Sequence, residues 1–203
     1  MIDLEALMQN QALATRSISH RGSTYTLRLL EPRDAEAFGA YLKNLNRETR
    51  SFFGPHPHTD RAATEICAAL DLRTFLRFVL IDTEGSIVGY FLLAPSVNQA
   101  EIGRFGARDI AISGETDCTF APSLADSKQS RGLGSVVGRI VLDIACELGF
   151  SRVVLSGGVQ ARNARGVAFY TKIGFRKIGE FKTRNSEGIE ILNFDMIHDS
   201  MCD

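Results

Sequence analysis

The stretch SKQSRGLGSVVGRIVLDIACELGF, residues 127–150, places a glycine-rich loop directly before a long amphipathic segment. In that segment apolar residues recur at helical spacing, charged residues occupy the opposite side, and Gly149 follows the last turn. The pattern predicts a helix that begins beside Gly132 and Gly134. Because a helix N-terminus carries unpaired N–H groups and partial positive charge, a loop with so few side chains can hold a phosphate there.

Two familiar phosphate-binding patterns do not fit this loop. A nucleoside triphosphate loop of the GxxxxGK[ST] type requires a Lys followed by Ser or Thr, and neither pair follows these glycines. A dinucleotide fingerprint requires GxGxxG and an acidic residue about 20 positions later. Here the glycines stand at 132, 134 and 138, and the strand SRVVLSG that follows the helix has no acid. The phosphate must therefore belong to another kind of ligand.

The rest of the chain alternates strand and helix signals, which predicts an α/β (α+β) domain of three layers. Residues 95–114 show no single period, and an insertion or an irregular strand is expected there. The expected helices cover residues 1–20, 32–46, 60–71, 133–149 and 163–174; the expected strands cover 24–30, 74–82, 86–94, 115–125, 152–156, 175–181 and 189–197.

Two blocks of this sequence resemble the GNAT superfamily of acyl-CoA N-acyltransferases. The run QSRGLG, residues 129–134, resembles the family signature Q/R-x-x-G-x-G/A. After the strand at Val153–Ser156, the run NARGVAFYTKIGF, residues 163–175, is similar to the family's pattern of Asn, helix, Tyr and Gly-Phe. The resemblance spans residues 24–197 of a single domain predicted over 1–203, with residues 1–20 as an N-terminal helical extension.

The resemblance implies a GNAT-like fold and a cofactor site. The expected fold is a central mixed, mostly antiparallel sheet with splayed middle strands, near 115–125 and 152–156, flanked by helices. Coenzyme A lies in the gap of that fold, so acetyl-CoA is the expected cosubstrate, and no metal is expected. The implied cofactor-binding residues are Gln129, Ser130, Arg131, Gly132, Leu133, Gly134, Ser135, Asn163 and Arg165.

Their implied roles differ. The backbone amides of Arg131 to Ser135 surround the pyrophosphate, and Asn163 steadies the pantetheine arm or the chain beside it. Arg131 and Arg165 are candidates for the nucleotide phosphates. In front of the glycines two alignments stay open: one keeps Pro122 inside the strand, and the other ends the strand at that proline and treats SLADSK as an insertion.

Transfer to an amine requires a base and an acid. An amine such as that of Lys has a pKa near 10, so it must lose a proton before it attacks a thioester. Tyr170 matches the family tyrosine that protonates the departing thiolate, although a core aromatic is the alternative. Glu115 is the predicted base, with Asp117, Glu101 or a chain of waters as alternatives; a solvated carboxylate at the strand end without a catalytic role is the other interpretation of Glu115. A backbone N–H of the splayed strand is expected to stabilise the oxyanion.

The acceptor pocket is predicted from the loop after the first core helix. The resemblance implies that Phe53, His56 and His58 border the substrate, whereas the alternative is a pair of surface histidines. A metal is not expected because Pro57 separates the two histidines and no third ligand stands nearby.

Charge is distributed unevenly along the chain. Residues 128–184 hold 11 Lys and Arg against three acids, so this segment carries +8 and the remainder −9. Such a field suits a polyanion, and the phosphates of acetyl-CoA explain it without nucleic acid. The acidic remainder favours a cationic acceptor.

The cellular setting is predicted from composition. The N-terminus carries Asp3 and Glu5 where a signal peptide would be basic, and no run approaches the ~18 apolar residues of a membrane span. The four cysteines are far apart and form no CxxC pair, which predicts reduced thiols and a cytoplasmic location.

The sequence therefore predicts an N-acetyltransferase that moves the acetyl group of acetyl-CoA to a primary amine on a small molecule or a protein. The alternative is a noncatalytic acyl-CoA-binding sensor. The expected partners are acetyl-CoA and the amine, without nucleic acid or membrane, and a homodimer is possible.

Overall fold

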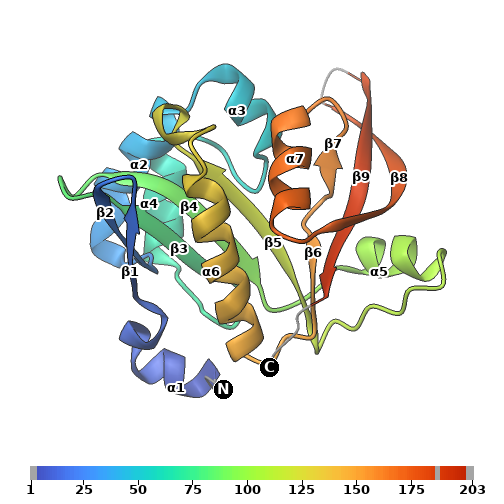
Figure 1. Cartoon of the computed structure of the whole chain (residues 1–203), viewed down its shortest axis with the longest axis horizontal. Helices are drawn as coiled ribbons and strands as arrows, with labels where there is room; N and C mark the ends of the chain where they lie inside the picture. Colours follow the sequence, from blue (N-terminus) through green and yellow to red (C-terminus); the bar gives the residue numbers. More distant parts are fainter. Residues whose placement is uncertain (1–3, 186–187, 200–203) are drawn as a thin grey trace.

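A nine-stranded sheet forms the middle layer of the computed structural model, which describes residues 4–185 and 188–199 (Figure 1). The strand order is β1-β2-β3-β4-β5-β6-β9-β7, with β8 paired to β9. Every described pair is antiparallel except β5 and β6, which are parallel. The predicted mixed, mostly antiparallel sheet is confirmed. The strands are β1 (Arg16–His20), β2 (Ser23–Leu29), β3 (Leu76–Ile81), β4 (Ile87–Ala94), β5 (Asp117–Leu124), β6 (Arg152–Leu155), β7 (Val159–Gln160), β8 (Arg176–Arg184) and β9 (Glu190–Asp199).

Helices pack on both faces of this sheet (Figure 1). Neighbouring strand residues alternate between the two cores: Phe120 belongs to the core under α6 and α7, and Ala121 to the core under α2 and α4. The helices are α1 (Leu4–Gln9), α2 (Ala35–Asn44), α3 (Arg47–Phe52), α4 (Asp60–Ala68), α5 (Gln99–Gly106), α6 (Leu133–Glu147) and α7 (Ala164–Lys172), with short 3₁₀ turns at Gln11–Ala14, Pro32–Asp34 and Asp126–Lys128.

Helix α6 follows the predicted pattern closely. Val137, Val141 and Ile144 are fully buried against the sheet, and Arg139 is exposed on the other side. The chain leaves the helix at Gly149, whose φ of 87° suits glycine. The helix thus fixes the glycine loop at the edge of the core.

The predicted helical extension over residues 1–20 is wrong for its last part. Arg16–His20 forms β1, which pairs with β2 through a tight turn at Arg21 and Gly22. Both turn residues have positive φ, 49° and 78°, as a two-residue hairpin of this kind requires. The Arg-Gly pair between two alternating runs was the signal for this hairpin.

The segment 95–114, where an insertion or an irregular strand is expected, contains the helix α5 and no strand. Asn98 caps this helix by accepting a hydrogen bond from the Glu101 N–H at 2.9 Å. Phe105 of α5 packs with Val154 of β6 and Ile197 of β9. Since Val153 and Leu155 face α6, α5 covers the opposite face of the sheet, the one that α2 and α4 cover farther along.

Two findings bear on the predicted cellular setting. Among the residues described, none of the helices is long and apolar enough to cross a membrane. Cys67 and Cys118 are free and buried, but Cys146 is disulfide-bonded. The prediction of reduced thiols is therefore wrong for Cys146, which weakens the redox argument for a cytoplasmic location.

Candidate functional site

Strands β5 and β6 pair over a short distance and then separate. Their parallel register runs from Asp117 opposite Arg152 to Phe120 opposite Leu155. The last hydrogen bond joins the Ser156 N–H to the Phe120 carbonyl at 3.2 Å. Beyond it β7 pairs with β9 instead of continuing beside β5. We call this point of separation the fork. The gap beyond it lies between β5 and the turn that joins β6 to β7.

Pro122 explains the fork on the β5 side. Thr116 and Phe120 accept hydrogen bonds from the β6 side, so even-numbered residues of β5 turn their backbone groups toward it. Pro122 is the next residue in that series, and it lies within the strand opposite Phe91 of β4. Because proline has no N–H, the next hydrogen bond from β5 cannot form. The strand also agrees with the alignment that keeps Pro122 inside it.

Gly157 and Gly158 turn the chain away on the β6 side. Both have a φ of 68°, a conformation that glycine adopts without strain. The Gly158 N–H donates to the Leu155 carbonyl at 3.1 Å, and the Gly157 N–H donates to Oε1 of Glu101 at 2.7 Å. Neither N–H is therefore available to β5.

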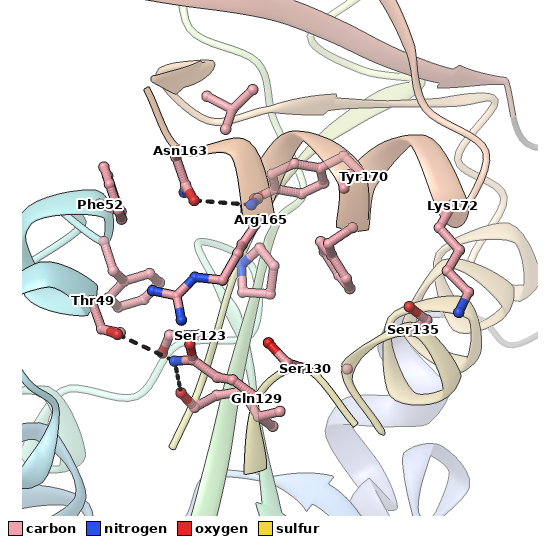
Figure 2. A pocket seen from close by; sticks show the side chains of 18 of the residues that line it. Thr49, Phe52, Ser123, Gln129, Ser130, Ser135, Asn163, Arg165, Tyr170 and Lys172 are labelled. Atoms are coloured by element: carbon pink, nitrogen blue, oxygen red, sulfur yellow. Dashed lines mark hydrogen bonds between the residues drawn. The ribbon is translucent and has the colours of Figure 1, made fainter. Parts of the chain in front are cut away.

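A cavity of about 430 Å³ occupies the gap beyond the fork (Figure 2). Figure 2 shows Ser135 and Lys172 at one end of it and Thr49 and Phe52 at the other. The lining residues are Thr49, Phe52, Phe53, Phe91, Pro122, Ser123, Leu124, Gln129, Ser130, Gly132, Gly134, Ser135, Gly158, Val159, Asn163, Arg165, Gly166, Ala168, Phe169, Tyr170 and Lys172.

The glycine loop, residues 129–135, forms the anion-binding end of this cavity. Ser130 and Gly132 have positive φ, 58° and 83°, which bends the loop around the start of α6. The N-cap residue Gly132 has no side chain with which to cap the helix. A Cβ at Gly134 would contact the Phe169 ring at 3.6 Å, so the loop lies close to α7. The first N–H groups of α6 are suited to an anionic ligand.

The predicted cofactor-binding residues divide into two groups. Arg131 and Leu133 do not line the cavity: Arg131 is exposed, and Leu133 is buried in the core under α6. The Arg131 carbonyl accepts a hydrogen bond from Nε2 of His20 at 2.9 Å, so β1 supports the loop from outside. The residues that do line the cavity are Gln129, Ser130, Gly132, Gly134, Ser135, Asn163 and Arg165.

Two of these side chains hold the local structure. Nε2 of Gln129 donates to the Leu124 carbonyl at 2.8 Å and lies 3.2 Å from the Thr49 hydroxyl. Oδ1 of Asn163 accepts from the Gly166 N–H at 2.9 Å and so caps α7 (Figure 2). Gln129 ties the loop to β5 and α3, and Asn163 fixes the start of α7.

The cations at the cavity lie at opposite ends. Arg165 reaches toward α3, where it forms an ion pair with Glu48 at 2.7 Å. Lys172, for which the sequence predicts no role, lines the same end of the cavity as Ser135 in Figure 2, and its carbonyl accepts from Arg139 of α6 at 2.8 Å. The signal for Lys172 was its spacing of seven residues from Arg165, which places both on one face of α7. Lys172 is therefore the cation nearer the glycine loop.

Tyr170 stands where β5 and β6 begin to separate. Its ring contacts Phe120 and Phe175 with centroid separations of 6.4 Å and 5.4 Å, while the residue also lines the cavity. Burial raises the pKa of the phenol above its ordinary value, so the hydroxyl keeps its proton at neutral pH. Tyr170 is therefore a core aromatic through its ring contacts and, at the same time, a residue of the cavity wall.

Glu115 lies at the wrong end of β5 to act at the cavity. It is an exposed turn residue before the strand, and its N–H donates to the Ser113 hydroxyl. At about 3.3 Å per residue, it is roughly 20 Å along the chain from Pro122. Asp117, the second candidate, is fully buried beside it and paired with Arg152 at 3.1 Å. Glu101, in contrast, contacts the backbone at the fork.

Phe53 lines the cavity, whereas His56 and His58 stand behind it. The His56 ring lies 5.9 Å from Phe53 and 5.6 Å from Tyr90, and the His58 ring lies 6.0 Å from Phe53. Burial lowers the pKa of both histidines, so both are neutral at pH 7. The structure places these histidines as packing partners of the cavity wall.

Helix α3, which the sequence did not predict, bridges the two sides of the gap. On the β5 side the Thr49 hydroxyl donates to Asp126 at 2.6 Å. On the α7 side Gln160 donates to the Ser51 carbonyl at 2.9 Å. A buried hydroxyl pair, Tyr41 and Ser123 at 2.7 Å, lies below, and Ser123 faces the cavity. Helix α3 spans six residues, too few for a clear helical period.

Comparison with known families gives one match. The family model described as "Acetyltransferase (GNAT) domain" matches residues 25–176, which include β5, the glycine loop, α6 and α7. A search of the curated proteins finds none that matches this chain.

Solved structures of similar fold cover nearly the whole chain. The ribosomal-protein-S5-alanine acetyltransferase from Vibrio fischeri has a TM-score of 0.70 at 17% identity, over 91% of this chain and 97% of that one. The GNAT domain of S. lividans PAT has a TM-score of 0.66 at 15% identity, over 93% and 98%. The aminoglycoside acetyltransferase AAC(6')-Ib in complex with coenzyme A has a TM-score of 0.61 at 17% identity, over 86% and 94%. At these identities the likeness concerns the fold.

Proposed function

The chain belongs to the GNAT acetyltransferase family, and on that premise we propose that it moves the acetyl group of acetyl-CoA directly to a primary amine. The observation that carries this proposal is the cavity that joins the start of α6 to the fork. One end offers N–H groups and Lys172 to a pyrophosphate, and the other opens at Tyr170 and α3. A cytoplasmic location, where the cofactor is made and used, belongs to the same proposal.

The backbone beyond the fork suits the pantetheine arm. Pro122 and Leu124 both turn their backbone groups into the gap, so β5 presents the Pro122 carbonyl and the Leu124 N–H there. The Leu124 carbonyl is taken by Gln129. An amide of the arm can pair with these two groups as an added strand would.

The proposed reaction has three steps. A neutral amine attacks the carbonyl carbon of the thioester, and negative charge develops on the carbonyl oxygen. Because Pro122 has no N–H, Leu124 is the gap-facing residue of β5 that offers a donor to that oxygen. The C–S bond then breaks, and the Tyr170 hydroxyl donates its proton to the thiolate. The N–H proton that the nitrogen loses as the amide forms restores the phenol through water.

Calorimetric titration with acetyl-CoA tests the cofactor site. The expected result is binding with a micromolar Kd that is lost in Gly134→Trp, because an indole there fills the cavity beside Phe169. Gly103→Trp is the matched control, since Gly103 is exposed on α5 and a Cβ there meets nothing within 4 Å. If the wild-type protein does not bind acetyl-CoA, the transferase proposal is wrong.

An amine panel then tests transfer. The names of two structural neighbours suggest the first acceptors, a peptide that begins with alanine and an aminoglycoside. A lysine-containing peptide and a polyamine complete the panel, and release of the free thiol of coenzyme A is the measurement.

A noncatalytic acyl-CoA sensor is the second candidate. The observation that favours it is Pro122, which removes a backbone donor next to the reacting carbonyl. A sensor would bind acetyl-CoA in the first experiment and release no thiol with any amine of the panel.

A further inference from the structure

A carboxyl group is buried at the fork without a complete set of partners. Glu101 is 1% exposed, and its Oε1 accepts the Gly157 N–H at 2.7 Å. Its Oε2 is also buried, and among the described residues no hydrogen-bond partner reaches it. An unpartnered carboxylate oxygen is costly to bury, so such an atom marks a place for a proton or a ligand.

This carboxyl group lies across the sheet from Tyr170. Tyr170 packs on Phe120 under α7, whereas α5 carries Glu101 on the opposite face and packs on Val154. The bond from Gly157 to Glu101 comes one residue after the last hydrogen bond between β5 and β6, at Ser156. Glu101 and Tyr170 therefore approach the same point from two sides.

The residues beside the Glu101 carboxyl in the turn after β6 have small side chains or none. Ser156 and Gly157 are exposed, and a Cβ at Gly157 would have nothing within 4 Å. The next residues, Gly158 and Val159, line the cavity. Glu101 itself does not line the cavity, so a proton from an amine at the fork reaches Oε2 through a water beside Gly157.

Charges around Glu101 nearly balance. Arg104 on α5 and Asp195 on β9 face it, and Asp195 is itself paired with Arg104 at 3.0 Å and Arg108 at 3.5 Å. Burial raises the pKa of the Glu101 carboxyl, and the Gly157 hydrogen bond and the Arg104 charge oppose that rise. A carboxylate whose pKa moves toward neutral is a better match for taking a proton near pH 7.

We propose that Glu101 is the proton acceptor for the amine that attacks at the fork. The inference rests on the proposed transferase function and deepens it. An ammonium N–H bond breaks, and its proton passes through a water beside Gly157 to Oε2 of Glu101. The amine lone pair then forms the C–N bond, the C–S bond breaks, and the thiolate takes a proton from Tyr170. The nitrogen loses its second proton as the amide forms, and that proton restores the Tyr170 phenol through water. The reaction enters with acetyl-CoA and a protonated amine and leaves as an amide, a thiol and a proton that Glu101 returns to water.

The test compares Glu101→Gln with Glu115→Gln over a range of pH. Glutamine keeps an oxygen for the Gly157 N–H and loses the ability to take a proton, so it is close in shape to the native side chain. With an acceptor from the amine panel, we expect kcat of Glu101→Gln to fall at least about a hundredfold. The rise of kcat/KM with pH that a base produces is expected to disappear, with the Kd for acetyl-CoA unchanged. Glu115→Gln is expected to match the wild type.

Other outcomes distinguish a failure of the Glu101 proposal from a failure of the proposed transferase function. If Glu101→Gln keeps turnover within about threefold and the same pH profile, Glu101 is a structural residue and the inference is wrong, while the transferase function stands. If the wild type binds acetyl-CoA but releases no thiol with any amine, the transferase function fails and Glu101 has no such role. If Glu101→Gln melts early, Glu101→Asp decides: a higher kcat than the glutamine variant supports the carboxylate, and equal loss overturns it.

Discussion

At one end of the cavity, seven consecutive residues, 129–135, form the glycine loop; at the other, the fork is assembled from β5, the β6–β7 turn, α3 and α5. The loop offers backbone N–H groups at a fixed helix terminus, which suits an anion that is bound and left unchanged. In the proposed mechanism the fork brings together an acid, Tyr170, and a carboxylate, Glu101, from two faces of the sheet. Changes at the loop should therefore alter binding, and loss of the Tyr170 hydroxyl or the Glu101 carboxylate at the fork should alter turnover.

Among the changes that distinguish the binding end from the reacting end, Tyr170→Phe is expected to have the largest effect, and that effect is on kcat. Phenylalanine keeps the ring contacts with Phe120 and Phe175 and removes the hydroxyl. We expect kcat to fall about 10²-fold or more while the Kd for acetyl-CoA stays the same. Stopped assays of thiol release and calorimetry supply the two values. Tyr25→Phe, at a buried tyrosine of β2 outside the cavity, should change neither, and a Tyr170 variant with full turnover would leave the fork without its acid.

Pro122→Ala tests what keeps the fork open. Alanine restores an N–H in line with the parallel ladder, so one more hydrogen bond to the Ser156 carbonyl can form and narrow the gap. We expect acetyl-CoA to bind about tenfold more weakly and the unfolding free energy to rise by about 0.5–1.5 kcal/mol, the usual net value of one hydrogen bond.

Pro55→Ala in the exposed loop after α3 is the control for the loss of a proline, and calorimetry with denaturant unfolding provides the measurements. Tighter binding of acetyl-CoA by Pro122→Ala would show instead that the N–H restored at position 122 donates to the ligand. That result would favour the sensor interpretation of the wild-type chain.

Lys172→Ala and Arg165→Ala compare the two cations of the cavity. Lys172 stands at the start of α6, and Arg165 is engaged with Glu48 on α3. We expect Lys172→Ala to weaken acetyl-CoA binding about five- to tenfold and to reduce its dependence on salt, because a phosphate contact is lost. Arg165→Ala should cost about twofold, since this exposed ion pair contributes little. The reverse order would place the nucleotide phosphates at the α3 end.

One end of the cavity is a contiguous segment and the other is assembled from distant segments, and this difference decides what the sequence could predict. The loop and α6 are contiguous, so QSRGLG and a stripe of buried residues such as Val137 and Val141 identified them. The fork depends on Pro122, Gly157 and Glu101, which are far apart in sequence and meet through strand register. A register is fixed by pairing across the sheet and not by local pattern.

The site residues that sequence reasoning placed wrongly or missed have the same origin. The sequence predicts Glu115 as the base from its place at the start of the strand signal, but β5 begins at Asp117 and runs away from Glu115 toward the fork. Lys172 comes to the loop because the C-terminal half of α7 packs beside the first turns of α6, where Arg139 donates to the Lys172 carbonyl at 2.8 Å. Neither direction can be read from a motif.

The smallest expected effect concerns support of the loop from outside. His20 ends β1, which lies before the matched family region, and its Nε2–H donates to the Arg131 carbonyl at 2.9 Å. Since the bond is exposed, its loss in His20→Ala should weaken acetyl-CoA binding only about two- to threefold, with kcat unchanged. His20→Gln, whose amide can donate to the same carbonyl, should restore the affinity. A loss of kcat with intact affinity would mean that the hairpin acts on the fork, and the separation between a binding end and a reacting end would not hold for the N-terminal segment.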